Sequence, residues 1–117
     1  MDRLMDALFD LMPQVRYVAV YRHGELSLRQ RSDLSLASAS ESDRYEELLV
    51  NPTVLTLTRQ RGDIDCGGLS YVVVGYGNFF QFVVPIEGGH LSVAFEPEAD
   101  PIGHAQEVLH TIEAHLT

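Results

Sequence analysis

Three apolar segments in the second half of the chain constrain its fold more than any other sequence feature. They are LSYVVVGYG (69–77), FFQFVVPI (79–86) and HLSVAFE (90–96), and the glycine-containing pairs Gly77-Asn78 and Gly88-Gly89 separate them. Valine, isoleucine and aromatic residues are enriched in strands, whereas glycine beside asparagine or another glycine forms tight turns. The sequence therefore predicts three consecutive antiparallel strands joined by hairpins.

Two helices and a further hairpin are predicted outside this region. Residues 2–12 predict a helix, because leucine and methionine recur at helical spacing while aspartates take the opposite side. VRYVAVYRHGELSLRQ (15–30) predicts a hairpin that turns at His23-Gly24. The last helix is predicted in residues 100–116, where alanine, valine, leucine and isoleucine form one stripe.

The middle of the chain contains an ambiguous segment. A serine-rich run at 33–42 predicts a loop. ESDRYEELLV predicts a helix that begins near the end of that loop. The next twelve residues, NPTVLTLTRQRG, fit a strand by alternation or a helix by boundary chemistry. We favour a helix, because Asn51 suits an N-cap, Pro52 the first helical position and Gly62 the position just after the last turn.

The order of these elements is αββαβββα. It predicts an α+β fold in which helices pack on a five-stranded antiparallel sheet. With 117 residues, the chain is expected to form a single domain, residues 1–117. No apolar run approaches the roughly 18 residues that a membrane span requires, and three aspartates in the first twelve residues are unlike a signal peptide. A cytoplasmic protein is expected, with no membrane partner.

The charge distribution excludes several classes of function. The formal net charge is −9, and all eight basic residues are arginine, so lysine-dependent chemistry is absent. Residues 62–117 carry eight acidic residues and no arginine or lysine. Nucleic-acid affinity depends on cationic contacts to phosphate, so DNA or RNA is not expected as a partner. The acidic half either binds a basic protein surface or serves solubility alone.

The single cysteine, Cys66, is a weak candidate for catalysis. It lies in RQRGDIDCGG, where Asp63 and Asp65 disfavour the thiolate that a nucleophile needs. The segment is more typical of a turn that leads into a strand. A cysteine-dependent enzyme remains the alternative, and it predicts a depressed thiol pKa. No Ser-His-Asp or paired-carboxylate arrangement follows from the spacing of other residues, so no enzyme activity is expected.

The histidines do not predict a metal or cofactor site. His104, Glu107 and His110 recur at spacings of three, and Glu-x-x-His is a di-iron element when it faces a bundle core. Here Glu107 and His110 are expected to face water, opposite the apolar stripe. His23 and His90 fall at hairpin turns and are expected at the surface.

The chain resembles a Roadblock/LC7 domain, a small α/β module related in shape to profilin and longin folds. The resemblance rests on the hairpin YRHGEL, on YVVVGYGNFFQFVVPI followed by GGHLSVAFE, and on Ile102-Gly103 in ADPIGHAQEVL. It covers nearly the whole chain. One departure is LLVNPTVL, where an Asn-Pro pair interrupts the segment that forms one long helix in the family.

The resemblance implies a non-enzymatic function without a cofactor. Members form homo- or heterodimers by pairing their second helices and third strands, and they bind small Ras-like GTPases or act as scaffolds; bacterial relatives regulate a partner GTPase. By this resemblance, a homodimer contact is expected near Leu55, Thr58, Leu69, Tyr71 and Val73. The residues add support, because YVVVGY is apolar at consecutive positions and is expected at a sheet edge.

Two hypotheses of different classes follow. The first is a dimeric interaction module that regulates or scaffolds a small Ras-like GTPase. The second is a profilin-shaped sensory module that holds a small ligand between sheet and helix. The second predicts an enclosed pocket lined by Tyr17, Tyr21, Phe80 or Phe82.

Overall fold

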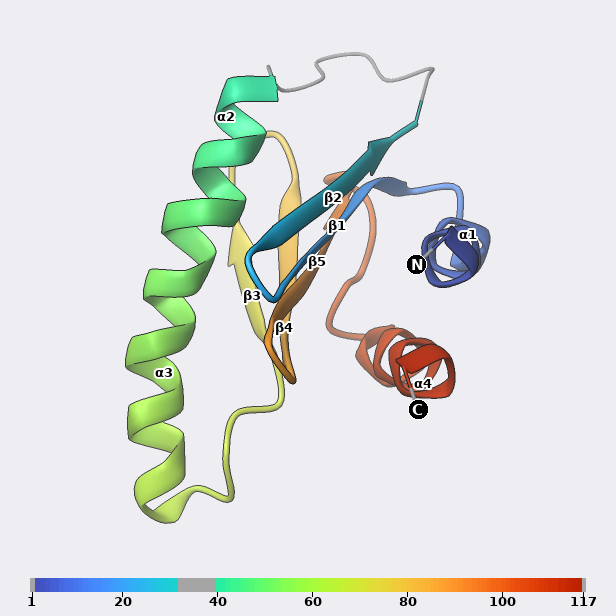
Figure 1. The fold of residues 1–117 in the computed structure, drawn as a ribbon. Coiled ribbons are helices and arrows are strands. Elements are labelled where there is room, and N and C mark those ends of the chain that lie inside the picture. The colour runs from blue at the N-terminus through green and yellow to red at the C-terminus, as the bar shows by residue number, and fades with distance from the viewer. Residues whose placement is uncertain (1, 32–39, 117) are drawn as a thin grey trace.

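The computed structural model describes residues 2–31 and 40–116, and it has three layers (Figure 1). A long helical column covers one face of a central sheet, and the first and last helices cover the other. The elements are α1 (Asp2–Leu11), β1 (Val15–Arg22), β2 (Glu25–Gln30), α2 (Ser40–Tyr45), η1 (Glu46–Val50), α3 (Asn51–Asp65), β3 (Val72–Gly75), β4 (Phe80–Ile86), β5 (Gly89–Phe95) and α4 (Ala105–Leu116). This order confirms the predicted α+β fold with a five-stranded antiparallel sheet.

The sheet has the strand order β2-β1-β5-β4-β3, which confirms β3 at an edge. The first hairpin turns at His23 and Gly24, both with positive φ, as predicted. Strand β3 is shorter than the apolar segment that predicted it. Only Val72 to Gly75 pair with β4, in register with Val83 to Phe80.

The two faces of the sheet differ in chemistry. Alternate residues of β1, β4 and β5 point towards α1 and α4, where they form the main apolar core. The core residues from the strands include Val18, Val20, Phe82, Val84, Leu91, Val93 and Phe95, and those from the helices include Leu4, Leu8, Val108 and Ile112. The face under the helical column carries a smaller apolar cluster of Tyr17, Ala19 and Ala94, together with Val83 and polar side chains.

The helical column is continuous from Ser40 to Asp65, so the expected interruption at Asn51-Pro52 is absent. Asn51 is not an N-cap. Its backbone N–H bonds to the carbonyl of Glu46, five residues earlier, which makes the turn before Pro52 a π-helical one. Proline has no N–H to donate, and the wider turn accommodates this loss within the column. The loop expected at 33–42 lies mostly outside the described residues, and Ser40–Ser42 belong to α2.

The threonine hydroxyls of α3 are hydrogen-bonded within the helix. Three threonine hydroxyls in α3 each donate to the carbonyl four residues earlier, at 2.7–2.8 Å. Such bonds satisfy the hydroxyl within the helix and leave the backbone ladder intact. The structure confirms the helical alternative that we favoured for NPTVLTLTRQRG.

Gly62 does not end the helix, contrary to the sequence prediction. The helix continues to Asp65, and the Gly62 carbonyl accepts hydrogen bonds from the N–H groups of Cys66 and Gly68, both at 3.1 Å. Gly67 has φ of 78° and turns the chain instead. Gly62 instead lies close to the returning chain, since a Cβ there would lie 3.1 Å from the backbone carbon of Gly68.

Within residues 2–31 and 40–116, no helix has both the length and the apolar character needed to cross a membrane.

Candidate functional site

A buried carboxylate connects the helical column to the sheet. Glu47 lies in the π-helical turn with an exposed fraction of 0%. Its Oε2 accepts hydrogen bonds from the hydroxyls of Tyr17 and Ser92, each at 2.6 Å, and from the amide of Gln81 at 3.3 Å. Its Oε1 lies 2.9 Å from the donating amide of Asn51 and 2.8 Å from Nε2 of His90. We call these six residues the Glu47 cluster: Tyr17, Glu47, Asn51, Gln81, His90 and Ser92.

The hydrogen bonds keep Glu47 ionised in spite of its burial. Burial is the largest influence on this carboxyl and acts to raise its pKa. The hydrogen bonds from His90, Ser92 and Tyr17 outweigh it, and the pKa of Glu47 lies below its ordinary value. For Tyr17, burial and then the adjacent Glu47 charge raise the phenol pKa. Because an ionised carboxylate only accepts hydrogen bonds, His90 donates from Nε2.

The Glu47 cluster holds the column on the sheet. Buried polar groups are costly unless they are all hydrogen-bonded, and here five donors converge on one carboxylate. This requirement fixes the depth and rotation of the π-helical turn, and with it the outward face of the column.

Sequence reasoning missed the Glu47 cluster. In YEELLV, Glu47 resembles an ordinary solvent-facing acid, and His90 was expected at the surface because it follows a turn. The second expectation was wrong: His90 is 1% exposed. A signal was present in the strands, where Gln81 and Ser92 interrupt otherwise apolar runs at positions that face the column. These two polar residues indicated that the strand face has a polar partner, but they did not indicate which helical residue it was.

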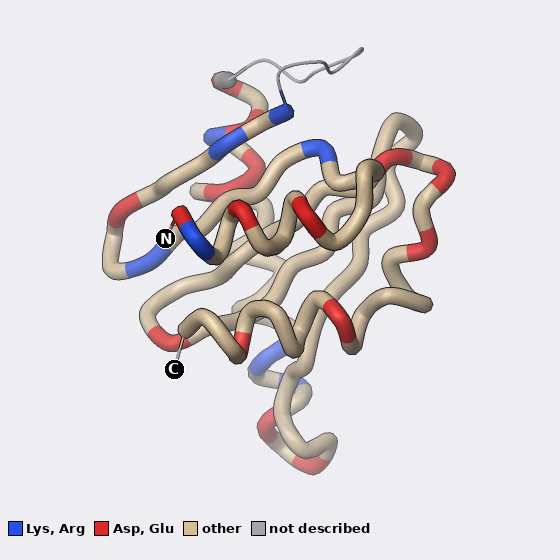
Figure 2. The backbone as a smooth tube through the Cα atoms, turned by 90° about the vertical axis from the view of Figure 1, so that its right-hand side faces the viewer, with Lys and Arg blue, Asp and Glu red and all other residues tan. Residues whose placement is uncertain are grey.

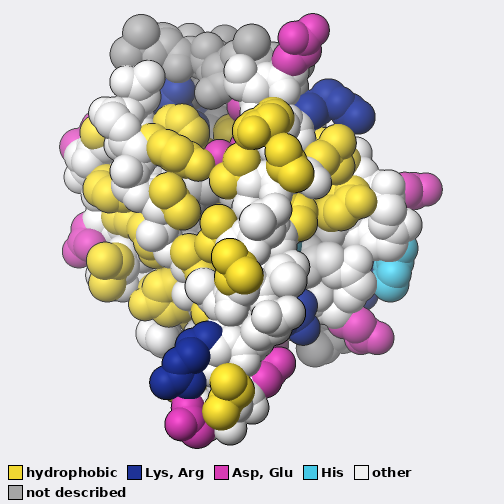
Figure 3. All heavy atoms as spheres, turned by 90° about the vertical axis from the view of Figure 1, so that its left-hand side faces the viewer, with side chains coloured by type: hydrophobic (Ala, Val, Ile, Leu, Met, Phe, Trp, Pro, Cys, Tyr) yellow, Lys and Arg dark blue, Asp and Glu magenta, His cyan; other side chains and the backbone are white. Residues whose placement is uncertain are grey.

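The outward face of the column carries exposed apolar side chains. Tyr45, Leu48, Leu49, Leu57 and Ile64 are the exposed large apolar residues of α2, η1 and α3. Figure 3 shows apolar side chains gathered on this side of the molecule. Leu57 and Ile64 are seven residues apart, so they lie two turns apart on one face. We call these five residues the outer helix face. The opposite side of the molecule, formed by α1 and α4, carries acidic residues on both helices (Figure 2).

The five residues expected near a dimer contact fall into two groups. On α3, Leu55 is only 5% exposed and faces the sheet, while the Thr58 hydroxyl is bonded to the carbonyl of Val54. Leu69 and Tyr71 precede β3, and Val73 lies within it. Tyr71 stacks on the buried Phe82, with ring centroids 4.9 Å apart. The outer helix face was not identified from the sequence.

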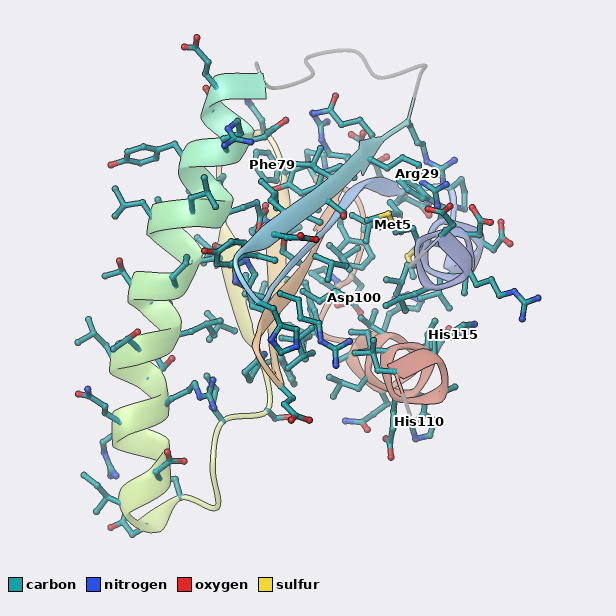
Figure 4. All side chains as sticks on the ribbon, viewed as in Figure 1. Met5, Arg29, Phe79, Asp100, His110 and His115 are labelled. Carbon is teal, nitrogen blue, oxygen red and sulfur yellow. The ribbon has the colours of Figure 1, made fainter. Side chains whose placement is uncertain are left out.

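A cleft opens between the start of the column and the turn that joins β3 to β4. Its volume is about 520 Å³. Phe79 lies between α2 and the sheet (Figure 4). We call this cleft the Tyr76 cleft. Its lining residues are Tyr17, Ser42, Asp43, Tyr45, Glu46, Val50, Tyr76, Gly77, Asn78 and Phe79.

Of the residues predicted to line a sensory pocket, Tyr17 lines the Tyr76 cleft and Tyr21 lines a smaller cleft of about 170 Å³ under α3. Tyr17 belongs to the apolar cluster under the column. Phe80 and Phe82 belong to the core on the opposite face of the sheet. Strand alternation places the two phenylalanines on the face opposite Tyr17 and Tyr21, so the four residues do not line one pocket.

The remaining candidates stay apart in space. Cys66 is exposed and its Sγ donates to Asp65 Oδ1 at 3.4 Å. Glu107 and His110 are exposed on α4, as predicted (Figure 4). In the part of the chain that the structure describes, no group of three or more His, Cys, Asp or Glu residues is placed to hold a metal ion.

Comparisons with known proteins identify the fold. No protein-family model matches the chain, and no curated protein matches it significantly. Among solved structures, it is similar to a Roadblock/LC7 domain from Streptomyces avermitilis, with a TM-score of 0.73 and 20% identity over 97% of this chain and 92% of that one. It is also similar to the gliding protein mglB from Thermus thermophilus, with a TM-score of 0.68 and 13% identity over 97% and 87% of the two chains. The chain therefore has the Roadblock/LC7 fold.

Proposed function

We propose that this chain is a non-enzymatic interaction module that forms a homodimer and regulates or scaffolds a small Ras-like GTPase in the bacterial cytoplasm. The observation that carries the proposal is the combination of an open β3 edge with the exposed apolar residues of the outer helix face. The fold supports it, because one structural neighbour is a gliding protein and the chain resembles a family of GTPase-associated dimers.

The β3 edge supplies the backbone part of the proposed dimer. An edge strand presents unpaired N–H and C=O groups, and pairing with the same strand of a second copy satisfies them around a two-fold axis. Leu69, Tyr71 and Val73 lie along this edge segment, so they are the expected contacts there. In such a dimer, the sheet would continue from one protomer into the next.

The outer helix face supplies the apolar part. Leu57 is 64% exposed and Ile64 is exposed as well, and burial of such side chains stabilises an interface by about 25 cal/mol for each Å² removed from water. Thr58 lies next to this face. Leu55 supports it from beneath through its contact with the sheet side.

The dimer is tested by light scattering and a matched pair of arginine variants. The purified protein should have a mass twice the 13.1 kDa of one chain. Leu57→Arg places a charge in the proposed interface and should give a monomer. Ile102→Arg is the control, because Ile102 has a similar exposed fraction, 67%, but lies outside the proposed interface. A wild-type monomer, or equal behaviour of the two variants, would contradict the proposed dimer.

The GTPase is tested separately. Wild-type protein is mixed with Ras-like GTPases from the same genome, and complex formation and GTP hydrolysis are measured. Binding to one of them in a nucleotide-dependent manner is expected, and a change in hydrolysis rate distinguishes regulation from tethering. A dimer that binds none of them contradicts the GTPase part of the proposal and leaves the dimer intact.

A further inference from the structure

We propose that the Tyr76 cleft is a binding site for the side chain of an arginine on a partner protein. The inference rests on the proposed function for the source of that arginine, but its chemistry comes from the cleft. A cleft of about 520 Å³ lies within the range of about 300–1,000 Å³ that is typical of ligand sites.

The cleft is acidic and contains an unsatisfied carboxylate oxygen. Asp43 and Glu46 line it, and none of the described lining residues is basic. Glu46 Oε1 accepts a hydrogen bond from the Tyr76 hydroxyl at 2.7 Å, while its Oε2 is buried and has no hydrogen-bond partner among the residues that the structure describes. A buried carboxylate oxygen without a donor is costly, so a cation bound in the cleft beside Glu46 would be stabilised.

The effect on Glu46 ionisation agrees with this deficit. Burial is the main cause that raises the pKa of Glu46, and the nearby Glu47 charge adds to it. The Tyr76 hydrogen bond opposes the rise only in part. Burial and the bond to Glu46 in turn raise the phenol pKa of Tyr76 to about 12. A cation in the cleft would relieve the repulsion between these neighbouring groups.

Aromatic rings form the walls of the same cleft. Tyr76 and Phe79 lie with their ring centroids 5.2 Å apart, and Tyr45 is 61% exposed beside them. The wall already contacts one guanidinium: Cζ of Arg16, which is paired with Glu96 at 3.0 Å, lies 5.5 Å from the Phe79 centroid. Aromatic rings attract cations, and arginine in particular stacks on them.

Arginine fits these features better than lysine. Its planar guanidinium offers five N–H donors in a fixed geometry that matches a carboxylate, and it is more weakly hydrated than an ammonium group. The cleft offers a carboxylate and ring faces together, so one guanidinium can use both. We expect the arginine to belong to a partner protein, because the cleft opens beside the outer helix face, where the proposed partner contacts lie.

The test is an NMR titration of ¹⁵N-labelled full-length protein with N-acetyl-L-arginine N-methylamide. Saturable shifts at Glu46, Tyr76 and Phe79 with a millimolar dissociation constant are expected. The capped citrulline analogue has nearly the same shape without the charge and should bind at least about tenfold more weakly, as should capped lysine. Equal shifts from arginine and citrulline would overturn the proposal, as would arginine shifts confined to α1 and α4.

Three variants sharpen the test. Glu46→Gln removes the cleft charge and should weaken arginine binding about tenfold. Glu98→Gln removes an exposed charge elsewhere and should leave binding unchanged, so equal losses in the two variants would overturn the proposal. Tyr76→Phe keeps the ring and frees Glu46 Oε1, so arginine binding should be retained; its loss would also overturn the proposal.

The outcome is separable from that of the proposed function. The titration monitors the cleft in the isolated protein, whereas light scattering measures the dimer. A dimer that does not bind capped arginine refutes the cleft proposal alone. A monomer that binds it refutes the proposed dimer alone.

Discussion

Replacing Glu47 by glutamine is the most informative perturbation of this fold. The substitution preserves the shape of the side chain but removes its charge and turns one acceptor into a donor. Whichever way the new amide is oriented, its NH₂ group faces donors, either Asn51 and His90 or the hydroxyls of Tyr17 and Ser92. The hydroxyls can rotate to accept a hydrogen bond, which makes the second orientation the less costly one.

The expected loss of stability is about 3–5 kcal/mol. Hydrogen bonds to a charged group contribute about 1.5–3 kcal/mol each, and those between neutral groups about 0.5–1.5 kcal/mol. Glu47→Gln also turns one acceptor into a donor that faces groups donating to Glu47, and a buried polar group left without a partner costs about 1–3 kcal/mol in addition to the weakened hydrogen bonds. Since small domains have about 5–15 kcal/mol of stability, the variant should fold but with a much smaller margin.

The loss should depend on pH in a defined direction. The pKa of Glu47 is lowered in the folded protein from an ordinary value of 4.5. A carboxylate with a lowered folded pKa adds stability that is complete above its unfolded pKa. That stability disappears as the pH falls through the folded pKa. The difference between wild type and Glu47→Gln should therefore be constant above about pH 5.5 and shrink as the pH falls below 4.5.

Urea denaturation followed by circular dichroism at a series of pH values measures this difference. With a slope of about 1–3 kcal/mol per molar urea, the midpoint at pH 7 should fall by roughly 2 M. Glu98→Gln, an exposed change of the same kind, is the control and should stay within about 0.5 kcal/mol of wild type. A Glu47→Gln loss below about 1 kcal/mol at pH 7, or one that does not diminish at acidic pH, would refute the reasoning.

Two further predictions concern the end of α3. Gly62→Ala should destabilise the protein by about 1 kcal/mol or more although alanine is the better helix former, because the new Cβ would lie 3.1 Å from the backbone of Gly68. The control is Gly77→Ala, where nothing lies within 4 Å of the added Cβ, so it should lose less stability. Thermal unfolding of both variants measures the difference, and equal losses would contradict the steric argument. Cys66→Ser should change the unfolding free energy by less than about 0.5 kcal/mol, because the thiol is exposed and bonds only to Asp65; a larger loss in chemical denaturation would assign Cys66 a structural role that its contacts do not explain.

Much of the fold could be predicted because its signals are local. The turn at His23-Gly24 and the hairpins of the second half depend on residues adjacent in sequence, and alternation within each strand sets its two faces. These hairpins and the start of the last helix resemble those of Roadblock/LC7 domains. That resemblance predicted the Roadblock/LC7 fold, which the structural neighbours confirm. The position of β3 at an edge was also expected, and the strand order confirms it.

The errors arose where a local preference competes with a distant contact. Asn51 and Pro52 are good residues for beginning a helix, yet in the structure Asn51 donates to Glu47 within a continuous column. Gly62 is a good helix stop by composition, yet α3 continues to Asp65 and the returning chain at Gly68 passes close to Gly62. In both cases, packing decided between structures that the local sequence allowed.

The sequence by itself determined the order of helices and strands, the position of most turns, and the acidic, lysine-free composition. Only the tertiary structure decided what Glu47 does, because its partners His90 and Ser92 lie 43 and 45 residues away and become neighbours only when the column docks on the sheet. The same docking leaves Leu57 and Ile64 facing water and opens the Tyr76 cleft. The local sequence pattern indicates which residues can form a helix or strand. Whether a charge is buried or an apolar face is exposed depends on which element packs against it in the tertiary structure.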